Sequence, residues 1–142
     1  MNVPFHLLLV RTFHAQKNRL APRLPEVGLS SGQPKIMHYL TGHNHCMQKD
    51  LAENCDIEPA TVSRLLENME QAGLIERGFA PGNRRAVLVS ITEAGTAAYN
   101  RWEEICDMVE LTSLKGFTPF EKQQFSGYLA RMYQNMTGHP IE

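Results

Sequence analysis

Three arginines in the middle of the chain, Arg64, Arg84 and Arg85, are the side chains best suited to bind a specific partner. A guanidinium can hold a guanine edge or a phosphate through two hydrogen bonds, so such residues suit contact with duplex DNA. Arg64 lies in a stretch with helical periodicity, whereas Arg84 and Arg85 directly follow the turn-forming residues 80–83 (APGN). The alternative for each is an ordinary solvated arginine on a helix or at a hairpin tip, and Arg84 suits either role equally.

A helix must position Arg64, and residues 58–72 have the pattern for one. Pro59 suits its first turn, because the missing N–H needs no partner there. Apolar residues at i, i+3, i+4 and i+7 predict one buried face: Val62, Leu65, Leu66 and Met69. The opposite face is short and polar near the helix start and carries Ala60, Thr61, Ser63, Arg64 and Asn68. Gly73 stands where a left-handed residue would end the helix.

A β-hairpin must position Arg84 and Arg85. Leu74 and Ile75 begin its first predicted strand, and residues 86–91 form the second, in which Val87, Val89 and Ile91 alternate with Leu88 and Ser90. A helix with a small polar face fits the major groove of DNA, and a two-stranded wing with arginines at its tip fits the neighbouring minor groove.

The remaining elements complete a mainly α-helical fold with a small β-wing. We predict helices over residues 4–18, 31–41, 47–54, 93–111 and 119–136, and a loop over 19–29. Ser30 or Ser31 would cap helix 31–41, and Thr92 would cap helix 93–111. Thr118 and Glu121 form a capping box at the start of helix 119–136. A short helix, a turn and a second helix followed by two strands define a winged helix-turn-helix.

Both chain ends contain more apolar surface than this small lobe can cover. The first helix has one stripe with Phe5, Leu8, Leu9 and Phe13, and a second with Val3, Leu7 and Val10. Each apolar side chain left in water forgoes roughly 1.5–3 kcal/mol. A homodimer packed through both ends would bury these stripes, and dimeric helix-turn-helix proteins place two recognition helices about 34 Å apart on DNA.

Composition limits the function in several ways. With 142 residues, 42% hydrophobic residues and a net charge of −1, the chain suits one soluble domain with a sizeable core. Residues 46–90 contain five basic side chains (Lys49, Arg64, Arg77, Arg84, Arg85) against seven acidic ones (Asp50, Glu53, Asp56, Glu58, Glu67, Glu70, Glu76). Bulk charge therefore does not favour DNA, and the case depends on where the few arginines lie. No nucleophile motif or fixed histidine–carboxylate pair indicates an enzyme.

The cysteines and histidines leave a sensor role open. Cys46, Cys55 and Cys106 form no CxxC pair, which favours reduced thiols in the cytoplasm over disulfides. Neither a signal peptide nor a membrane-spanning run is predicted. The cluster of His43, His45 and Cys46 could hold a metal, although a structural zinc site would need a fourth ligand at a suitable spacing. Oxidation of Cys46 and Cys55, which flank a short helix, is a further hypothesis. No cofactor is expected.

The segments LSSGQPKIMHYL and MQKDLAENCDIEPATVSRLLENMEQAGLIERGFAPGNRRAVLVSITEAG resemble the MarR family of bacterial transcriptional regulators, most closely across residues 29–95. The resemblance implies a homodimeric repressor that binds a palindromic operator in double-stranded DNA. It also implies release of the DNA by a small, often aromatic anion. Residues 1–29 and 92–142 would form the dimerisation region, and residues 30–91 the winged helix-turn-helix lobe.

The resemblance also assigns roles to individual residues. Thr61, Ser63 and Arg64 would face the major groove, and Arg85 would enter the minor groove. Gln48 and Lys49 begin the short helix, whose N-terminus attracts phosphate, although plain solvation of Lys49 is as good an explanation. The chain departs from the family at Asn83, where an acidic residue usually braces the wing. Asparagine can accept a hydrogen bond but cannot form an ion pair, which puts the rigidity of the wing in question.

Two alternatives use the same scaffold. A winged helix that binds another protein and has lost DNA binding would agree with the acidic balance of residues 46–90 and with Asn83. A metal or thiol sensor would use His43, His45, Cys46 or Cys55.

Overall fold

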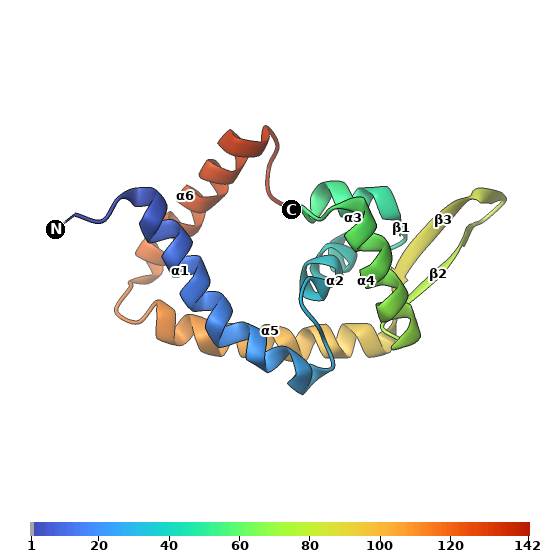
Figure 1. Cartoon of the computed structure of the whole chain (residues 1–142), viewed down its shortest axis with the longest axis horizontal. Helices are drawn as coiled ribbons and strands as arrows, with labels where there is room; N and C mark the ends of the chain where they lie inside the picture. The colour runs from blue at the N-terminus through green and yellow to red at the C-terminus, as the bar shows by residue number, and fades with distance from the viewer. Residues whose placement is uncertain (1) are drawn as a thin grey trace.

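The predicted recognition helix and hairpin lie at one end of an elongated, mainly helical molecule, the N-terminus lies at the opposite end, and the C-terminus lies next to α3 (Figure 1). A computed structural model describes residues 2–142. Its elements follow in chain order: α1 (Phe5–Leu20), the 3-10 helix η1 (Ala21–Val27), α2 (Gln33–Gly42), β1 (Cys46–Met47), α3 (Gln48–Asn54), α4 (Pro59–Gln71), β2 (Ile75–Ala80), β3 (Asn83–Ile91), α5 (Glu93–Ser113) and α6 (Pro119–Thr137). The mainly α fold with a small β-wing is confirmed.

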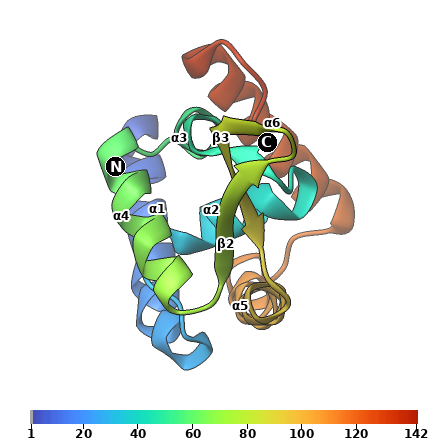
Figure 2. The same cartoon turned by 90° about the vertical axis from the view of Figure 1, so that its right-hand side faces the viewer.

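The lobe around α2, α3 and α4 has the hydrophobic core. Its largest fully buried side chains come from all three helices and from the sheet: Ile36, Met37, Leu40, Leu51, Val62, Leu66, Met69, Ile75 and Val89. The sheet is antiparallel with the strand order β1-β3-β2, so the short strand β1 closes one edge of the hairpin. In Figure 2, α4 lies beside β2 and the hairpin points towards the viewer.

Helix α4 begins and ends one residue inside the predicted range 58–72 and has the predicted buried face. Val62, Leu65, Leu66 and Met69 are its buried residues. The chain leaves the helix through Gly73, whose φ of 76° is the left-handed conformation expected after a helix C-terminus.

The junction between the hairpin and α5 is tightly packed. The Thr92 hydroxyl caps α5 by accepting a hydrogen bond from the Gly95 N–H at 3.0 Å, as predicted. A Cβ atom added at Gly95 would lie 2.1 Å from the carbonyl oxygen of Leu74. Only glycine therefore lets α5 start this close to the backbone of Leu74, the residue before β2.

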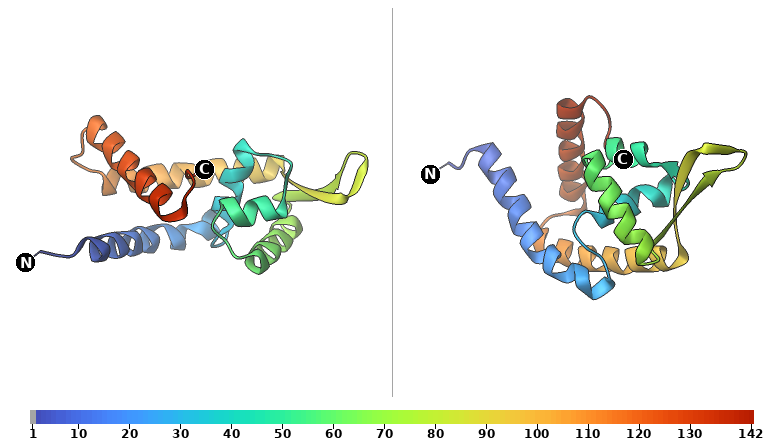
Figure 3. Two further views of the ribbon diagram at one scale, coloured as in Figure 1. Left: turned by 90° about the horizontal axis from the view of Figure 1, so that it is seen from above. Right: turned by 45° about the vertical axis from the view of Figure 1, so that its right-hand side comes forward.

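Helices α1 and α6 contain no buried residue, although both have apolar stripes. Phe5 and Phe13 of α1 are 66% and 58% exposed, and Tyr128 and Met136 of α6 are 56% and 76% exposed. These two helices lie at the opposite end of the molecule from the wing (Figure 3). The predicted caps of α6 are present, because Thr118 and Glu121 form the full capping box.

Three local predictions are wrong, and one short strand was missed. Residues predicted as the loop 19–29 contain η1, which buries Leu24 and Val27. The predicted caps of α2 by Ser30 or Ser31 are absent, because Gly32 with φ 88° precedes this helix. Strand β1 was not predicted. The second hairpin strand begins three residues earlier than predicted, at Asn83 rather than at residue 86.

Within residues 2–142, no helix combines the length and the apolar character needed to cross a membrane.

Candidate nucleic-acid interface

The outer face of α4 carries the predicted groove-facing side chains. Ala60, Ser63, Arg64 and Asn68 are exposed, and Thr61 is half-buried. The side chain of Gln48, at the first position of α3, donates a hydrogen bond to the Ser63 hydroxyl. Gln48 therefore has a partner within the protein, and its contact fixes the start of α3 against the middle of α4. Lys49, the next residue, is exposed.

The wing is braced at its tip by Asn83. Its Oδ1 atom accepts a hydrogen bond from the backbone N–H of Arg85 at 2.9 Å. The strand pairing also shifts between Phe79 and Ala80, so that Ala80 pairs with Asn83 across the turn. A neutral amide oxygen thus holds the turn by a hydrogen bond alone, and Arg84 and Arg85 lie exposed at the start of β3.

The base of the wing is joined to the lobe on both sides. The Asn44 side chain accepts a hydrogen bond from the Ile91 N–H at 3.0 Å, and His45 Nδ1 lies 2.6 Å from the Ser90 hydroxyl. His45 adopts φ 62°, a left-handed conformation. On the other edge of the hairpin, Arg77 of β2 donates to Glu70 of α4 at 3.0 Å.

The Arg77–Glu70 pair also shifts the pKa of both partners. Its hydrogen bond lowers the pKa of Glu70 and raises the pKa of Arg77. This ion pair fixes the hairpin relative to the recognition helix. Sequence reasoning missed it, because seven residues and a turn separate the two partners.

Three acidic residues of the lobe have partners within the protein, although the net charge of residues 46–90 stays acidic. Glu70 is paired with Arg77, Asp50 accepts from the Met47 N–H at 2.9 Å, and Asp56 accepts from Tyr133. By contrast, none of Lys49, Arg64, Arg84 and Arg85 forms an ion pair with any residue of the described range 2–142. Three of the acidic groups thus serve the fold, while the cations on the outer surface have no such partner.

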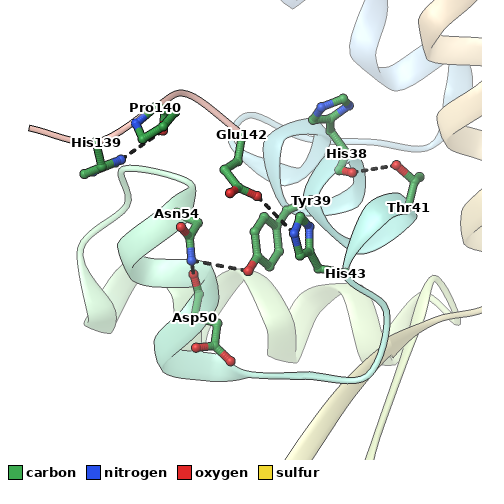
Figure 4. Close-up of polar contacts among 9 residues, drawn as sticks. All are labelled: His38, Tyr39, Thr41, His43, Asp50, Asn54, His139, Pro140 and Glu142. Carbon is green, nitrogen blue, oxygen red and sulfur yellow. Dashed lines mark hydrogen bonds and ion pairs between the residues drawn. The ribbon is translucent and has the colours of Figure 1, made fainter. Parts of the chain in front are cut away.

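The C-terminal tail rests against the helix-turn-helix. The Tyr133 hydroxyl of α6 donates to the Asp56 carboxylate at 2.7 Å, in the turn between α3 and α4. Within this turn Asp56 adopts the left-handed backbone conformation, with a φ of 55°. Further along, a Glu142 carboxylate oxygen lies 3.0 Å from His43 Nε2, and His43 stacks on Tyr39 (Figure 4). No pattern in the sequence predicted these contacts between distant segments.

The side chains considered for a metal have separate partners. His43 faces Glu142 and Tyr39, whereas His45 faces Ser90. Across residues 2–142, no three histidine, cysteine or acidic side chains gather in a way that could hold a metal ion. The metal-sensor hypothesis therefore gains no support from the geometry.

The thiols are poorly suited to a redox role. Burial raises the pKa of Cys46, Cys55 and Cys106 to about 11 each. Lys35 partly opposes this shift at Cys55. Reactive thiols need a lowered pKa, because the thiolate is the nucleophile.

Comparison with known proteins agrees with this geometry. The sequence profile of the MarR family matches residues 27–86, which contain the helix-turn-helix and most of the wing. The Bacillus subtilis protein YwhA, described as an uncharacterized HTH-type transcriptional regulator, is 26% identical over 99 residues, which are 70% of this chain and 71% of YwhA.

Solved structures extend the likeness over the whole fold. A MarR-family transcriptional regulator from Silicibacter pomeroyi is 26% identical, with a TM-score of 0.80 over 94% of this chain and 90% of that one. A MepR variant from Staphylococcus aureus, solved bound to an oligodeoxyribonucleotide, is 23% identical, with a TM-score of 0.64 over 95% of this chain and 99% of MepR. The architecture is thus that of a winged helix-turn-helix regulator. The matching profile, YwhA and these structures together make the chain similar to the MarR family of transcriptional regulators.

Proposed function

We propose that this chain is a homodimeric, sequence-specific repressor that binds a palindromic operator in double-stranded DNA. Residues 30–91 would be the DNA-binding lobe, and residues 1–29 and 92–142 the dimerisation region. One observation carries the proposal. The exposed polar face of α4 lies beside a wing whose tip arginines, Arg84 and Arg85, have no ion-pair partner within residues 2–142.

The residue roles follow from this arrangement. Ala60, Thr61, Ser63, Arg64 and Asn68 would face the major groove, with Arg64 able to bind a guanine bidentately. Arg85 would enter the minor groove, held in place by Asn83 through its backbone N–H. Lys49 and Arg84 would contact phosphates, and Gln48 would orient Ser63 while lying close to the backbone. The S. aureus MepR variant bound to an oligodeoxyribonucleotide supports the same general use of the fold.

The unburied stripes of α1 and α6 support the dimer. Phe5, Met132 and Met136 line grooves between the two helices, and these grooves are almost entirely apolar. A second copy offers an equally apolar surface, so twofold packing would bury both. It would also pair two α4 helices for the half-sites of a palindrome.

An effector would act where the lobe meets α5. His38 of α2 lies with Nδ1 2.8 Å from the hydroxyl of Tyr99 in α5, and Tyr99 in turn donates to Glu103. Burial and the contact with Glu103 raise the pKa of Tyr99, so its hydroxyl stays protonated and can donate a hydrogen bond. We propose that a small aromatic anion exchanges for part of this polar chain, changes the angle of the lobe and releases the DNA.

The test begins with selection of duplexes from a random-sequence pool by the wild-type protein. An enriched, twofold-symmetric sequence bound by one dimer is the expected result. A panel of aromatic carboxylates is then added to the complex, and release by at least one of them is expected. A chain that selects no duplex contradicts the DNA-binding proposal and favours a protein-binding module. Selection without release by any member contradicts only the effector part.

A further inference from the structure

The wing exposes an apolar pair that neither the fold nor the arginines explain. Phe79 of β2 is 64% exposed and Val87 of β3 is 42% exposed. The two residues are direct cross-strand partners, so their side chains lie on the same face of the hairpin. The hairpin extends beyond the lobe (Figure 1), and both residues of the pair are exposed to solvent.

This face of the hairpin is the one turned towards α4. The next pair on the same face is Arg77 with Val89, two residues nearer the lobe. Val89 is fully buried in the core, and Arg77 reaches Glu70 of α4. Phe79 and Val87 therefore continue the core-facing side of the sheet outwards, on the side where α4 lies (Figure 2).

The charge of the hairpin indicates what covers this pair. Residues 77–89 contain three arginines (Arg77, Arg84, Arg85) and no acidic residue. Arg77 is paired with Glu70, but Arg84 and Arg85 form no ion pair within residues 2–142, and an apolar patch beside such cations complements a polyanion with apolar walls. The minor groove of DNA has this character, because deoxyribose edges line it between the phosphates, and proteins that bind there often insert apolar side chains. The patch is also continuous with the proposed contact of Arg85.

We propose that Phe79 and Val87 pack against the deoxyribose edges at the rim of the minor groove and act as a positioning contact for the wing. This inference rests on the proposed DNA-binding function and adds an uncharged contact to it. Arg85 supplies electrostatic attraction, and the apolar pair sets how deeply the wing enters the groove.

Salt dependence separates this contact from an electrostatic one. Each phosphate contact adds roughly −0.9 to the slope of log affinity against log salt concentration, whereas an apolar contact adds nothing to it. Phe79→Thr keeps a β-forming residue but removes the ring. We expect it to weaken binding to the duplex selected by the wild-type protein at least fivefold at every salt concentration, with the slope unchanged.

Three variants complete the experiment. Phe79→Leu keeps an apolar side chain at the same position and should retain affinity within about twofold. Val87→Thr should weaken binding less than Phe79→Thr, since Val87 is the smaller and less exposed partner. Arg85→Ala should reduce the magnitude of the salt slope by about 0.9, as the electrostatic reference. The midpoint of thermal unfolding is measured for each variant.

The outcomes separate the inference from the proposed function. Wild-type affinity in a folded Phe79→Thr variant overturns the inference and leaves DNA binding intact. Equal losses for Phe79→Leu and Phe79→Thr, or a loss accompanied by a lower unfolding midpoint, assign Phe79 to the hairpin itself and also overturn it. A wild-type chain that binds no duplex overturns both proposals together.

Discussion

The lobe and the chain ends bury their apolar residues to very different extents. In α4 the four-residue stripe is buried against α3, β2 and the sheet, and Val62, Leu66 and Met69 are fully inaccessible. Helices α1 and α6 also carry apolar stripes, weaker than that of α4, and contain no buried residue. Sequence periodicity reveals which face of a helix is apolar but not which molecule covers it. The lobe is complete in one chain, and the ends require a second copy if the proposed dimer is correct.

The largest expected effect comes from breaking the joint between the two regions. Gly95→Ala places a methyl group 2.1 Å from the Leu74 carbonyl oxygen, and the Ile91 side chain lies 2.9 Å from the same point. Backbone atoms cannot move aside as a flexible side chain would, so α5 must shift or its first turn must unwind. We expect the free energy of unfolding to fall by at least about 3 kcal/mol, measured by urea denaturation.

Gly127→Ala in α6 is the matched control for this substitution. Nothing lies within 4 Å of a Cβ atom at Gly127. Replacing an exposed helix glycine by alanine should raise stability by about 0.5–1 kcal/mol. If Gly95→Ala proves as harmless as Gly127→Ala, the joint is more adaptable than its geometry indicates.

Local features of the sequence predicted most of this fold, because they act over one helical turn or one hairpin. The caps at Thr92 and Thr118, the left-handed Gly73 and the buried face of α4 are all of this kind. The missed features join distant segments. Strand β1 exists only because Cys46 pairs with Val89, and the tail contact needs Tyr133 to meet Asp56. No period or cap residue marks such pairs.

The candidate interface was predicted in the same way. The exposure of Ser63, Arg64 and Arg85 follows from periodicity and from the turn, and the structure agrees. The partners that organise these residues were not predicted, because they depend on how α3, α4 and the wing pack together. Gln48 was considered as a phosphate contact, yet it donates to Ser63. The DNA-contact roles of all these residues stay predictions.

A charge placed on the exposed apolar stripe of α6 should weaken the proposed dimer and leave the fold of the lobe intact. Phe125 of α6 is 43% exposed and lines the groove that α6 forms with Phe5 of α1. If a second copy covers this groove, Phe125→Asp buries an uncompensated carboxylate there. We expect the dimer dissociation constant to rise at least tenfold in sedimentation equilibrium. The far-ultraviolet circular dichroism spectrum of the protein should stay unchanged. Gln71→Asp, at the exposed end of α4, adds the same charge elsewhere and should leave the dimer intact.

Loss of one wing arginine should weaken DNA binding without affecting the fold. Arg85→Ala should lower operator affinity at least tenfold, or about 1.4 kcal/mol, because Arg85 is exposed and has no ion-pair partner within residues 2–142. Arg64→Ala should relax the preference at one position of each half-site by about 1–3 kcal/mol if Arg64 reads a base. Equal weakening on every sequence would instead assign Arg64 to phosphate. Arg101→Ala, an exposed arginine of α5, serves as the control in the same fluorescence-anisotropy titration.

The thiols provide a comparison across both regions, since Cys46 and Cys55 lie in the lobe and Cys106 in α5. All three have a pKa raised to about 11 by burial, above the reference value of 9.0. Between these values the unfolded chain loses protons that the folded chain keeps, so the free energy of unfolding should decrease as the pH rises from about 9 to 11 and be insensitive to these groups below 9. Urea titrations at pH 7.5, 9 and 10.5 measure it. Cys106→Ala removes one of the three thiols, so the free energy of unfolding of this variant should decrease less steeply with pH than that of the wild type.

The smallest effect is expected where the tail meets the lobe. Tyr133→Phe removes only the hydroxyl that donates to Asp56 at 2.7 and 3.0 Å. This contact raises the pKa of Tyr133, so it is present while the tyrosine is protonated and is lost at alkaline pH. The hydroxyl holds the end of α6 against the turn between α3 and α4, and the His43–Glu142 pair lies further along the same tail. Removing one anchor should therefore make the tail a better protease substrate while leaving the unfolding midpoint nearly unchanged.

Limited proteolysis followed by mass spectrometry would measure this cleavage. Tyr128→Phe is the control, because Tyr128 contacts Arg131 and lines the groove beside α1. Equal cleavage of both variants would mean that packing alone holds the tail, and that the lobe and the chain ends are linked chiefly through the start of α5.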